Sequence, residues 1–527
     1  MGNVNISNDL MESAVEAILS YKDHNRPDGS GIYTFWPQIY NQTKGIYTIF
    51  PVNLLNLMNT FGSFENAVDK VAQLFKWHGI LEDMKLIAQM MDTFKVAFEI
   101  PPDSDDSGVN LALGYQLSTI KHMYPQTYQT WQLANPNTSN VFSTYLEYAY
   151  RPFTNESSDS NSIDPRSYFM MHEFLESLSS DLQDSFLLPT TWMMSISEQK
   201  QTFPYLQMPF NVNNIDLSVS INSLFGIASA TRQYILENNG QLPDFFTQDI
   251  ENLCQSIAST VSWAITSGRV YNRTDITLLY YPSTYDFSWF ISRLVALLQE
   301  FQQPPSSLEY ALDTLLESLQ GPVTDHLLQA AMSETVGQKT YYFWDDFLGD
   351  ADTDLIGQKV LNGDDRLFST SLAVMTLIDT WTTRSGNSNT WLANTPTLIK
   401  TMVDGAIDFI NDRALKDKEQ TYNAFFSGSM KGSSTYTLAY PSNRCFYING
   451  TECDPHLNNQ EQYAIVSPFS GVVDAYTYQD MIGQLWANTS TPTTWTGFNP
   501  EAFPYWSSTP LTHAFCLLSL SKYLNFE

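Results

Sequence analysis

The stretch from Pro101 to Ile120, PPDSDDSGVNLALGYQLSTI, contains the pattern that decides the fold. A loop rich in Pro and Asp leads into Asp and Ser residues, and an apolar stretch with several small residues follows. Asp and Ser accept the first free backbone N–H groups of a helix, so this order predicts a capped helix start. The helix that follows is apolar nearly all round, which is typical of a buried helix.

The same form recurs along the chain and indicates an internal repeat. Further copies begin at Pro209, Tyr281, Asn362 and Pro504. Amphipathic helices with one polar face lie between the copies, among them residues 248–264, 308–320 and 397–414. Buried helices that alternate with half-exposed ones favour a closed ring of two helical layers. We therefore predict an all-α protein, an α/α toroid (barrel) of about six or seven helical hairpins, with residues 1–527 as a single domain.

Residues 424–473 break this pattern, because they are rich in Gly, Ser and Tyr and alternate with β-branched residues. Such composition predicts a long loop or a small β insertion over one end of the ring.

The formal net charge of −30 and the pI near 4.4 exclude nucleic acid as an expected partner, because phosphate binding needs clustered Lys and Arg. No window approaches the length of apolar sequence that spans a bilayer, so we expect no transmembrane segment. The high charge favours a soluble monomer or small homo-oligomer.

The four cysteines fall into two kinds. Cys254 and Cys516 lie in apolar helical stretches and are predicted to be buried free thiols. Cys445 and Cys453 lie in one polar loop, and a disulfide between them would indicate secretion. The N-terminus shows no basic start followed by an apolar run, so no signal peptide is predicted within this chain. Asn-x-Ser/Thr sequons also point to secretion, although a chain rich in these residues contains some by chance.

The turn before the first buried helix is the most acidic of the repeated turns. Asp103, Asp105 and Asp106 lie within four residues, and such carboxylates repel one another at a buried helix start. At least one of them should hold a proton at neutral pH. A protonated carboxyl beside ionised neighbours is suited to general acid catalysis. The alternative is structural: one Asp caps the helix and the others complement its dipole.

The run Asp103-Ser104-Asp105-Asp106-Ser107-Gly108 resembles the DxDD-[ST]-[AG] motif of the class II terpenoid cyclases, a family that includes the squalene–hopene cyclases. The turn from Arg26 to Gly31, followed by Phe35 and Trp36, is similar to the Gly-aromatic turns that join hairpins in those proteins. The resemblance implies an α/α toroid in which the middle aspartate protonates an isoprenoid. Asp105 would then be the acid, and Asp103 and Asp106 would tune it.

The resemblance also implies a cavity lined with aromatic side chains, whose ring faces stabilise carbocations. Aromatic residues in the loops before the predicted buried helices are the candidates for contact with a small hydrophobic isoprenoid. The predicted substrate-binding aromatics are Trp36, Tyr285, Trp289, Trp344 and Trp506. Ordinary core packing is the alternative for each of them.

A second acidic stretch contains Asp345, Asp346 and Asp350. Its oxygens suit a hard cation, but the favoured interpretation is a cluster of Asp on a solvated loop, and Leu361 stands where an EF-hand needs a glutamate. The metalloprotease, P-loop, Rossmann and nucleophile-elbow motifs are absent, and the histidines are scattered. We therefore expect neither a metal nor a cofactor.

Two other functions fit the same fold prediction, because a fold alone does not fix a function. A glycan-active hydrolase or lyase would pair Asp105 or Asp106 with Asp216, Asp364 or Asp365 in an aromatic-lined cleft. Asp216 and Asp365 are therefore also candidate substrate-binding residues. The third alternative is a non-catalytic binding toroid.

Overall fold

The computed structural model describes the chain in several ranges. They are 6–26, 30–42, 45–49, 100–153, 163, 165–195, 198, 213–346, 365–386, 388–416, 421, 423–427, 446–447, 463–464 and 505–526. Within these ranges the protein is mostly helical with few short strands, in agreement with the predicted all-α class. The main hydrophobic core contains residues from Ile32 to Cys516, and the described residues form two smaller buried clusters besides it.

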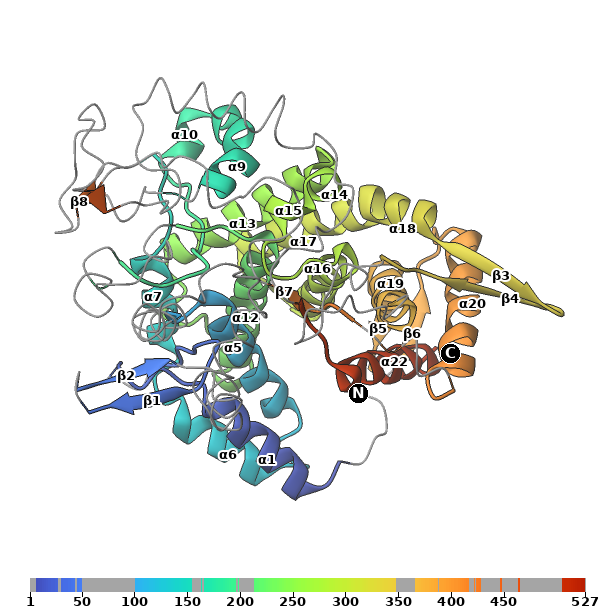
Figure 1. The fold of residues 1–527 in the computed structure, drawn as a ribbon, viewed down its shortest axis with the longest axis horizontal. Helices are drawn as coiled ribbons and strands as arrows, with labels where there is room; N and C mark the ends of the chain where they lie inside the picture. Colours follow the sequence, from blue (N-terminus) through green and yellow to red (C-terminus); the bar gives the residue numbers. More distant parts are fainter. Residues whose placement is uncertain are drawn as a thin grey trace, which may run out of the picture.

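Five helices form a row in which each packs on the next (Figure 1). They are α5 (Ser104–Thr119), α12 (Leu217–Glu237), α16 (Thr284–Leu298), α19 (Arg366–Trp381) and α22 (Thr509–Leu524). All five arise from the repeated sequence pattern. The prediction of buried helices holds best at α19, where every residue from Leu367 to Trp381 is buried. It fails for α22, of which only Thr512, Cys516, Ser519 and Ser521 are buried.

A second layer of helices covers the row. The helix α6 packs on α5, α13 on α12, α17 on α16 and α20 on α19. Their bounds are Pro125–Ala134 for α6, Gln248–Thr266 for α13, Ser306–Ser318 for α17 and Thr397–Arg413 for α20. The last three are the helices predicted from a single apolar face, and each buries that face while its polar side remains exposed.

The segments that precede the first four helices of the row are bonded to one another. The Ser104 N–H donates to the Thr191 carbonyl at 3.0 Å, and the Thr191 N–H donates to the Asn214 carbonyl at 2.7 Å. The Tyr280 N–H donates to Asp216 Oδ2 at 2.8 Å. The Ser283 hydroxyl donates to Asp346 Oδ2 at 2.7 Å, and the Asp346 N–H donates to Asp365 Oδ1 at 3.2 Å. These four helix starts therefore lie together on one side of the row.

The remaining described helices are short or peripheral. They are α1 (Asn8–Leu19), α7 (Ser139–Glu147), α9 (Pro165–Ser177), α10 (Ser180–Gln183), α14 (Arg269–Asn272), α15 (Thr274–Thr277), the π-helix η1 (Leu319–Val323) and α18 (Thr324–Ala330). None of the described helices combines the length and apolar sequence needed to cross a bilayer.

The described strands pair only as antiparallel two-stranded ribbons. Three are hairpins: β1 (Gln38–Asn41) with β2 (Ile46–Ile49), β3 (Met332–Val336) with β4 (Lys339–Phe343), and β5 (Thr382–Ser385) with β6 (Ser388–Trp391). The β3–β4 hairpin extends away from the helices beside α20 (Figure 1). Within the predicted insertion, β8 (Phe446–Tyr447) pairs with β9 (Tyr463–Ala464). β7 (Phe426–Ser427), also in the insertion, pairs with β10 (Tyr505–Trp506), which lies outside it.

Cys254 and Cys516 are buried free thiols, which confirms that prediction. Several other predictions lie outside the described residues. They concern the disulfide between Cys445 and Cys453, the carboxylates Asp350 and Asp364, residues 27–29 of the Gly-aromatic turn, and the side chain of Trp506.

Candidate functional site

The start of α5 is built around Asp103, the N-cap residue of the helix. Its Oδ1 accepts the Asp106 N–H at 2.7 Å, and its carbonyl accepts the Ser107 hydroxyl, also at 2.7 Å. The Ser107 hydroxyl oxygen in turn accepts the Tyr33 N–H at 3.1 Å. These hydrogen bonds join the start of α5 to Tyr33 in the N-terminal segment and hold the backbone of the acidic turn in place.

Asp105 lies in the first turn of α5 and is buried between helices. Its Oδ1 accepts the side-chain N–H of Asn222, on α12, at 2.6 Å. Its Oδ2 accepts the hydroxyl of Tyr281, in the segment before α16. Burial, followed by the charge of Asp106, raises the pKa of Asp105 to about 7, while the two hydrogen bonds oppose this rise. The carboxyl is therefore able to hold or release a proton near neutral pH.

Asp103 and Asp106 complete the acidic turn. Burial and the neighbouring charges of Asp106 and Asp105 raise the pKa of Asp103 well above its usual range. Burial also raises the pKa of Asp106. Asp103 Oδ2 is buried without a hydrogen-bond partner, which favours its protonated form. Asp103 is thus both the helix cap and an electrostatic neighbour of Asp105.

A half-buried arginine, Arg293 on α16, contacts Asn222. Its Nη2 donates a hydrogen bond to the Asn222 side-chain oxygen. Its guanidinium carbon is 4.6 Å from the ring centroids of Phe225, Trp289 and Phe290. Burial lowers its pKa to about 10, so the guanidinium remains charged at neutral pH. Sequence reasoning missed both Arg293 and Asn222; a cation and an amide inside otherwise apolar helices were the available signals.

Asp286, on the same helix, is a second buried carboxyl that sequence reasoning missed. It is 2% exposed, and its Oδ2 has no hydrogen-bond partner. Burial raises its pKa well above the usual range, and the positive charge of Arg293 opposes that rise. Arg293 therefore interacts electrostatically with two carboxyl groups, Asp105 and Asp286.

Aromatic rings gather around the ring of Tyr281. The Phe426 ring stacks on Phe35 at 4.7 Å between centroids and meets the Tyr281 ring edge-on at 5.5 Å. Trp36 meets Phe35 edge-on at 4.6 Å, and Tyr281 meets Phe290 edge-on at 5.2 Å. Five of the aromatic side chains around this site keep some exposure, namely Phe35, Trp36, Tyr281, Trp289 and Phe426. This set, called the aromatic cluster below, includes two of the predicted substrate-binding residues.

The other predicted aromatics lie elsewhere. Tyr285 is 4% exposed and packs in the core. Trp344 is fully buried, and its indole N–H donates to the Leu327 carbonyl at 2.8 Å. These two rings offer little or no surface to a substrate. Phe426 was missed because it belongs to the region predicted only as an insertion.

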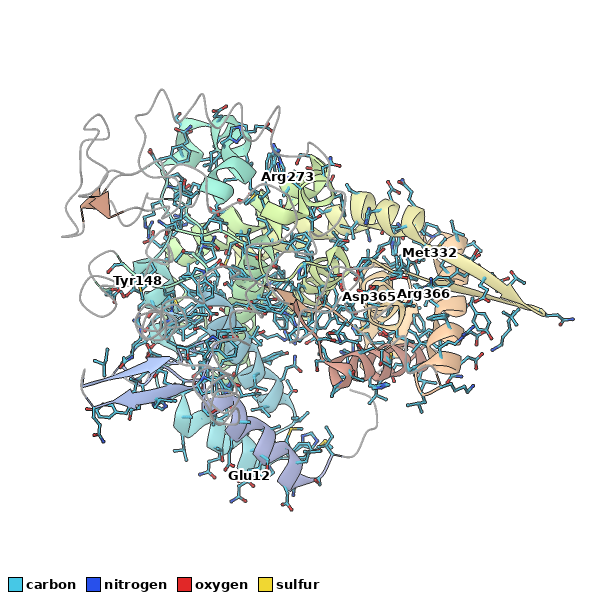
Figure 2. The ribbon with its side chains drawn as sticks, viewed as in Figure 1. Glu12, Tyr148, Arg273, Met332, Asp365 and Arg366 are labelled. Atoms are coloured by element: carbon cyan, nitrogen blue, oxygen red, sulfur yellow. The ribbon has the colours of Figure 1, made fainter. Side chains whose placement is uncertain are left out.

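Asp216 and Asp365 lie directly before helices, Asp216 before α12 and Asp365 before α19. Asp216 Oδ1 accepts the backbone N–H groups of Ser218 and Val219, and its Oδ2 accepts the Tyr280 N–H. Asp365 precedes α19 and lies beside Arg366 at the start of that helix (Figure 2). Asp345 forms a 3.0 Å ion pair with Arg366. Burial raises the pKa of Asp365 well above its usual range. Asp216 thus bonds the start of its own helix to the backbone of Tyr280, and Asp365 Oδ1 accepts the Asp346 N–H at 3.2 Å.

The described part of the chain contains no group of three or more His, Cys, Asp or Glu residues with the geometry to hold a metal ion. Comparison with protein-family models, curated proteins and solved structures found no match for this chain.

Proposed function

We propose that the chain is a terpenoid cyclase-like enzyme in which Asp105 protonates a hydrophobic isoprenoid and so starts its cyclisation. The observation that carries this proposal is the buried Asp105 carboxyl, with a pKa of about 7, bonded to Tyr281 at the edge of the aromatic cluster. A proton donor in an aromatic environment is what alkene protonation requires. The resemblance of Asp103–Gly108 to the cyclase motif supports the same chemistry.

In this reaction the Asp105 O–H bond breaks and a C–H bond forms at one alkene carbon. The positive charge that develops on the other alkene carbon is stabilised by nearby ring faces. Asp105 becomes a carboxylate, which the hydrogen bonds from Asn222 and Tyr281 stabilise. When the cyclised cation loses a proton to a base, the alkene product forms and no cofactor is consumed.

The proposed fold around this site is the α/α toroid of about six or seven hairpins. The two-layered row of helices and the convergence of four helix starts support it. In such a ring, the starts of the inner helices surround one opening of a central chamber.

The direct test is incubation of the purified chain with squalene, oxidosqualene and geranylgeranyl diphosphate, followed by mass spectrometry of the extracted products. We expect a cyclic product from at least one of them, and its loss in D105N, which keeps the size and hydrogen bonding of the side chain. S229A is the matched control, because the Ser229 hydroxyl is buried without a partner on α12. An undiminished product yield in D105N would exclude the proposed role of Asp105.

The second candidate is a glycan-active enzyme, and Asp286 is the observation that favours it. Glycosidases use two carboxyl groups with separated pKa values. Asp105 and Asp286 are two buried carboxyls that both interact with Arg293. Release of reducing sugar from a polysaccharide panel, abolished in both D105N and D286N, would favour this function over cyclisation.

A further inference from the structure

We infer that Arg293 is a positioning residue for Asp105: through the Asn222 amide, it determines that the acidic proton of Asp105 is carried by Oδ2. The relevance of this arrangement to catalysis rests on the proposed function of Asp105. The arrangement itself follows from three consecutive hydrogen bonds that join α16, α12 and α5.

The first step concerns the orientation of the Asn222 amide. A guanidinium group has hydrogen-bond donors and no acceptor. The Asn222 atom that faces Arg293 Nη2 must therefore be the oxygen, as the geometry has it. The amide nitrogen then points to the opposite side, where it lies 2.6 Å from Asp105 Oδ1. Arg293 thus removes the usual ambiguity between the two ends of the amide.

The second step concerns the proton on Asp105. The Asn222 N–H points at Oδ1. A proton on Oδ1 that pointed toward Asn222 would therefore face the hydrogen of that N–H, and the two would repel each other. Oδ2 faces the Tyr281 hydroxyl, which can either donate or accept a hydrogen bond. When Asp105 is protonated, the O–H is therefore on Oδ2 and Tyr281 turns to accept it. The proton is held on the side of the carboxyl that faces the aromatic cluster.

The third step concerns the cost of keeping a cation in this place. Arg293 lies over three aromatic rings, and its Nε has no hydrogen-bond partner. Desolvation of a charge opposes folding unless specific contacts offset it. The ring contacts offset part of that penalty, and the hydrogen bond to Asn222 gives the charge a defined orientation. A purely apolar side chain would fill the same space without fixing the amide.

Several other ionisable groups also act on Asp105. Asp103 and Asp106 lie beside it on α5, and Asp216 lies at the start of α12. The Tyr145 hydroxyl on α7 donates to the Ser104 carbonyl at 2.7 Å and lies near the same turn. These groups are unchanged in a variant of Arg293. A change in the pKa of Asp105 in that variant therefore comes from the altered orientation of the Asn222 amide and from the lost positive charge.

The test is a titration of Asp105 that needs no substrate. The carbonyl stretch of protonated carboxyls is followed by infrared spectroscopy from pH 5 to 9 in protein labelled with ¹³C-aspartate. Subtraction of the D105N spectrum isolates the Asp105 band. We expect R293M to raise the apparent pKa of Asp105 by about one unit, a tenfold change in proton affinity, because the positive charge is lost and the freed amide can turn its oxygen toward Asp105. We expect R293K to remain close to wild type, because an ammonium also has donors only.

An R293M titration that coincides with wild type, or an equal shift in R293K and R293M, would overturn the inference. If R293M does not fold, N222L supplies the same test, because it removes the donor to Oδ1 at nearly constant volume. An Asp105 pKa in N222L that matches wild type would likewise overturn the inference. Failure of every isoprenoid to react would instead count against the proposed function and leave this titration result intact.

Discussion

Gly226 of α12 packs directly against Gly108 of α5: a Cβ atom at Gly226 would lie 2.4 Å from the Gly108 carbonyl oxygen and 2.6 Å from its Cα. The contact is backbone against backbone, so no flexible side chain could yield to it. Asn222 lies one helical turn before Gly226, and Asp105 lies one turn before Gly108. The close approach of the two glycines therefore sets the 2.6 Å hydrogen bond between Asn222 and Asp105.

The variant G226A should separate α5 from α12. Added volume in a closely packed contact typically costs about 1–3 kcal/mol, and here the backbone itself must move. We expect a loss of unfolding free energy in that range, measured by urea denaturation, together with a shift in the Asp105 titration as the bond to Asn222 lengthens.

S229A on the same helix is the control for G226A, because it removes one buried oxygen that has no partner and adds nothing. Its stability should match wild type or rise slightly. If G226A proved as stable as S229A, the close contact between the two glycines would not hold in solution.

Asp105 should make the stability of the protein depend on pH. Its pKa rises from 3.8 to about 7 on folding, so between these values the folded state binds more protons than the unfolded state. The contribution of Asp105 is therefore fully present below about pH 4, declines as the pH rises, and is lost above about pH 7. A shift of about three units corresponds to about 4 kcal/mol.

The comparison of wild type with D105N at several pH values isolates this contribution, since all other carboxyls are common to both proteins. Urea unfolding should show wild type losing stability relative to D105N between pH 4.5 and 7.5. Parallel stability curves for the two proteins would mean that Asp105 titrates normally.

The repeated helix starts were predictable because capping is local: an Asp or Ser must lie within a few residues of the N–H groups it accepts. Asp103 and Asp216 are such caps. The acidic turn was also predictable, because Asp103, Asp105 and Asp106 are adjacent in sequence. Their mutual repulsion and burial follow from that adjacency and from the apolar helix behind them.

The partners of Asp105 were not predictable in the same way. Asn222 is 117 positions from Asp105, and Tyr281 is 176 positions away. Such pairs form only when packed helices bring them together, and a single sequence carries no signal for that pairing. The roles of Asp216 and Asp365 were also open, because a cap and a catalytic carboxylate look alike until their hydrogen-bond partners are known.

Asp216 should be a structural residue whose loss affects stability. It caps α12 and also accepts the N–H of Tyr280, and it is 1% exposed. In D216A the cap is lost and a buried N–H is left without a partner, so we expect a loss of about 2–4 kcal/mol. S7A removes the exposed cap of α1 and should cost about 1 kcal/mol or less. Equal losses in the two variants, measured by thermal or urea unfolding, would contradict the buried double role of Asp216.

The two tryptophans Trp344 and Trp289 should respond differently to the same change, replacement by Phe. The Trp344 indole N–H donates to the Leu327 carbonyl inside the core, which also accepts the Ala331 N–H at 3.1 Å. W344F therefore removes one of two hydrogen bonds to this carbonyl and part of a fully buried ring, and should cost about 1–3 kcal/mol. The Trp289 indole N–H has no partner, so W289F should change the unfolding free energy much less. W289F should instead weaken the ring contact with Arg293, since Trp binds a cation better than Phe does. Stability of both variants is measured by urea unfolding, and the carboxyl infrared band reports Asp105. A larger loss of stability in W289F than in W344F would mean that Trp289 is a core residue and not part of the site.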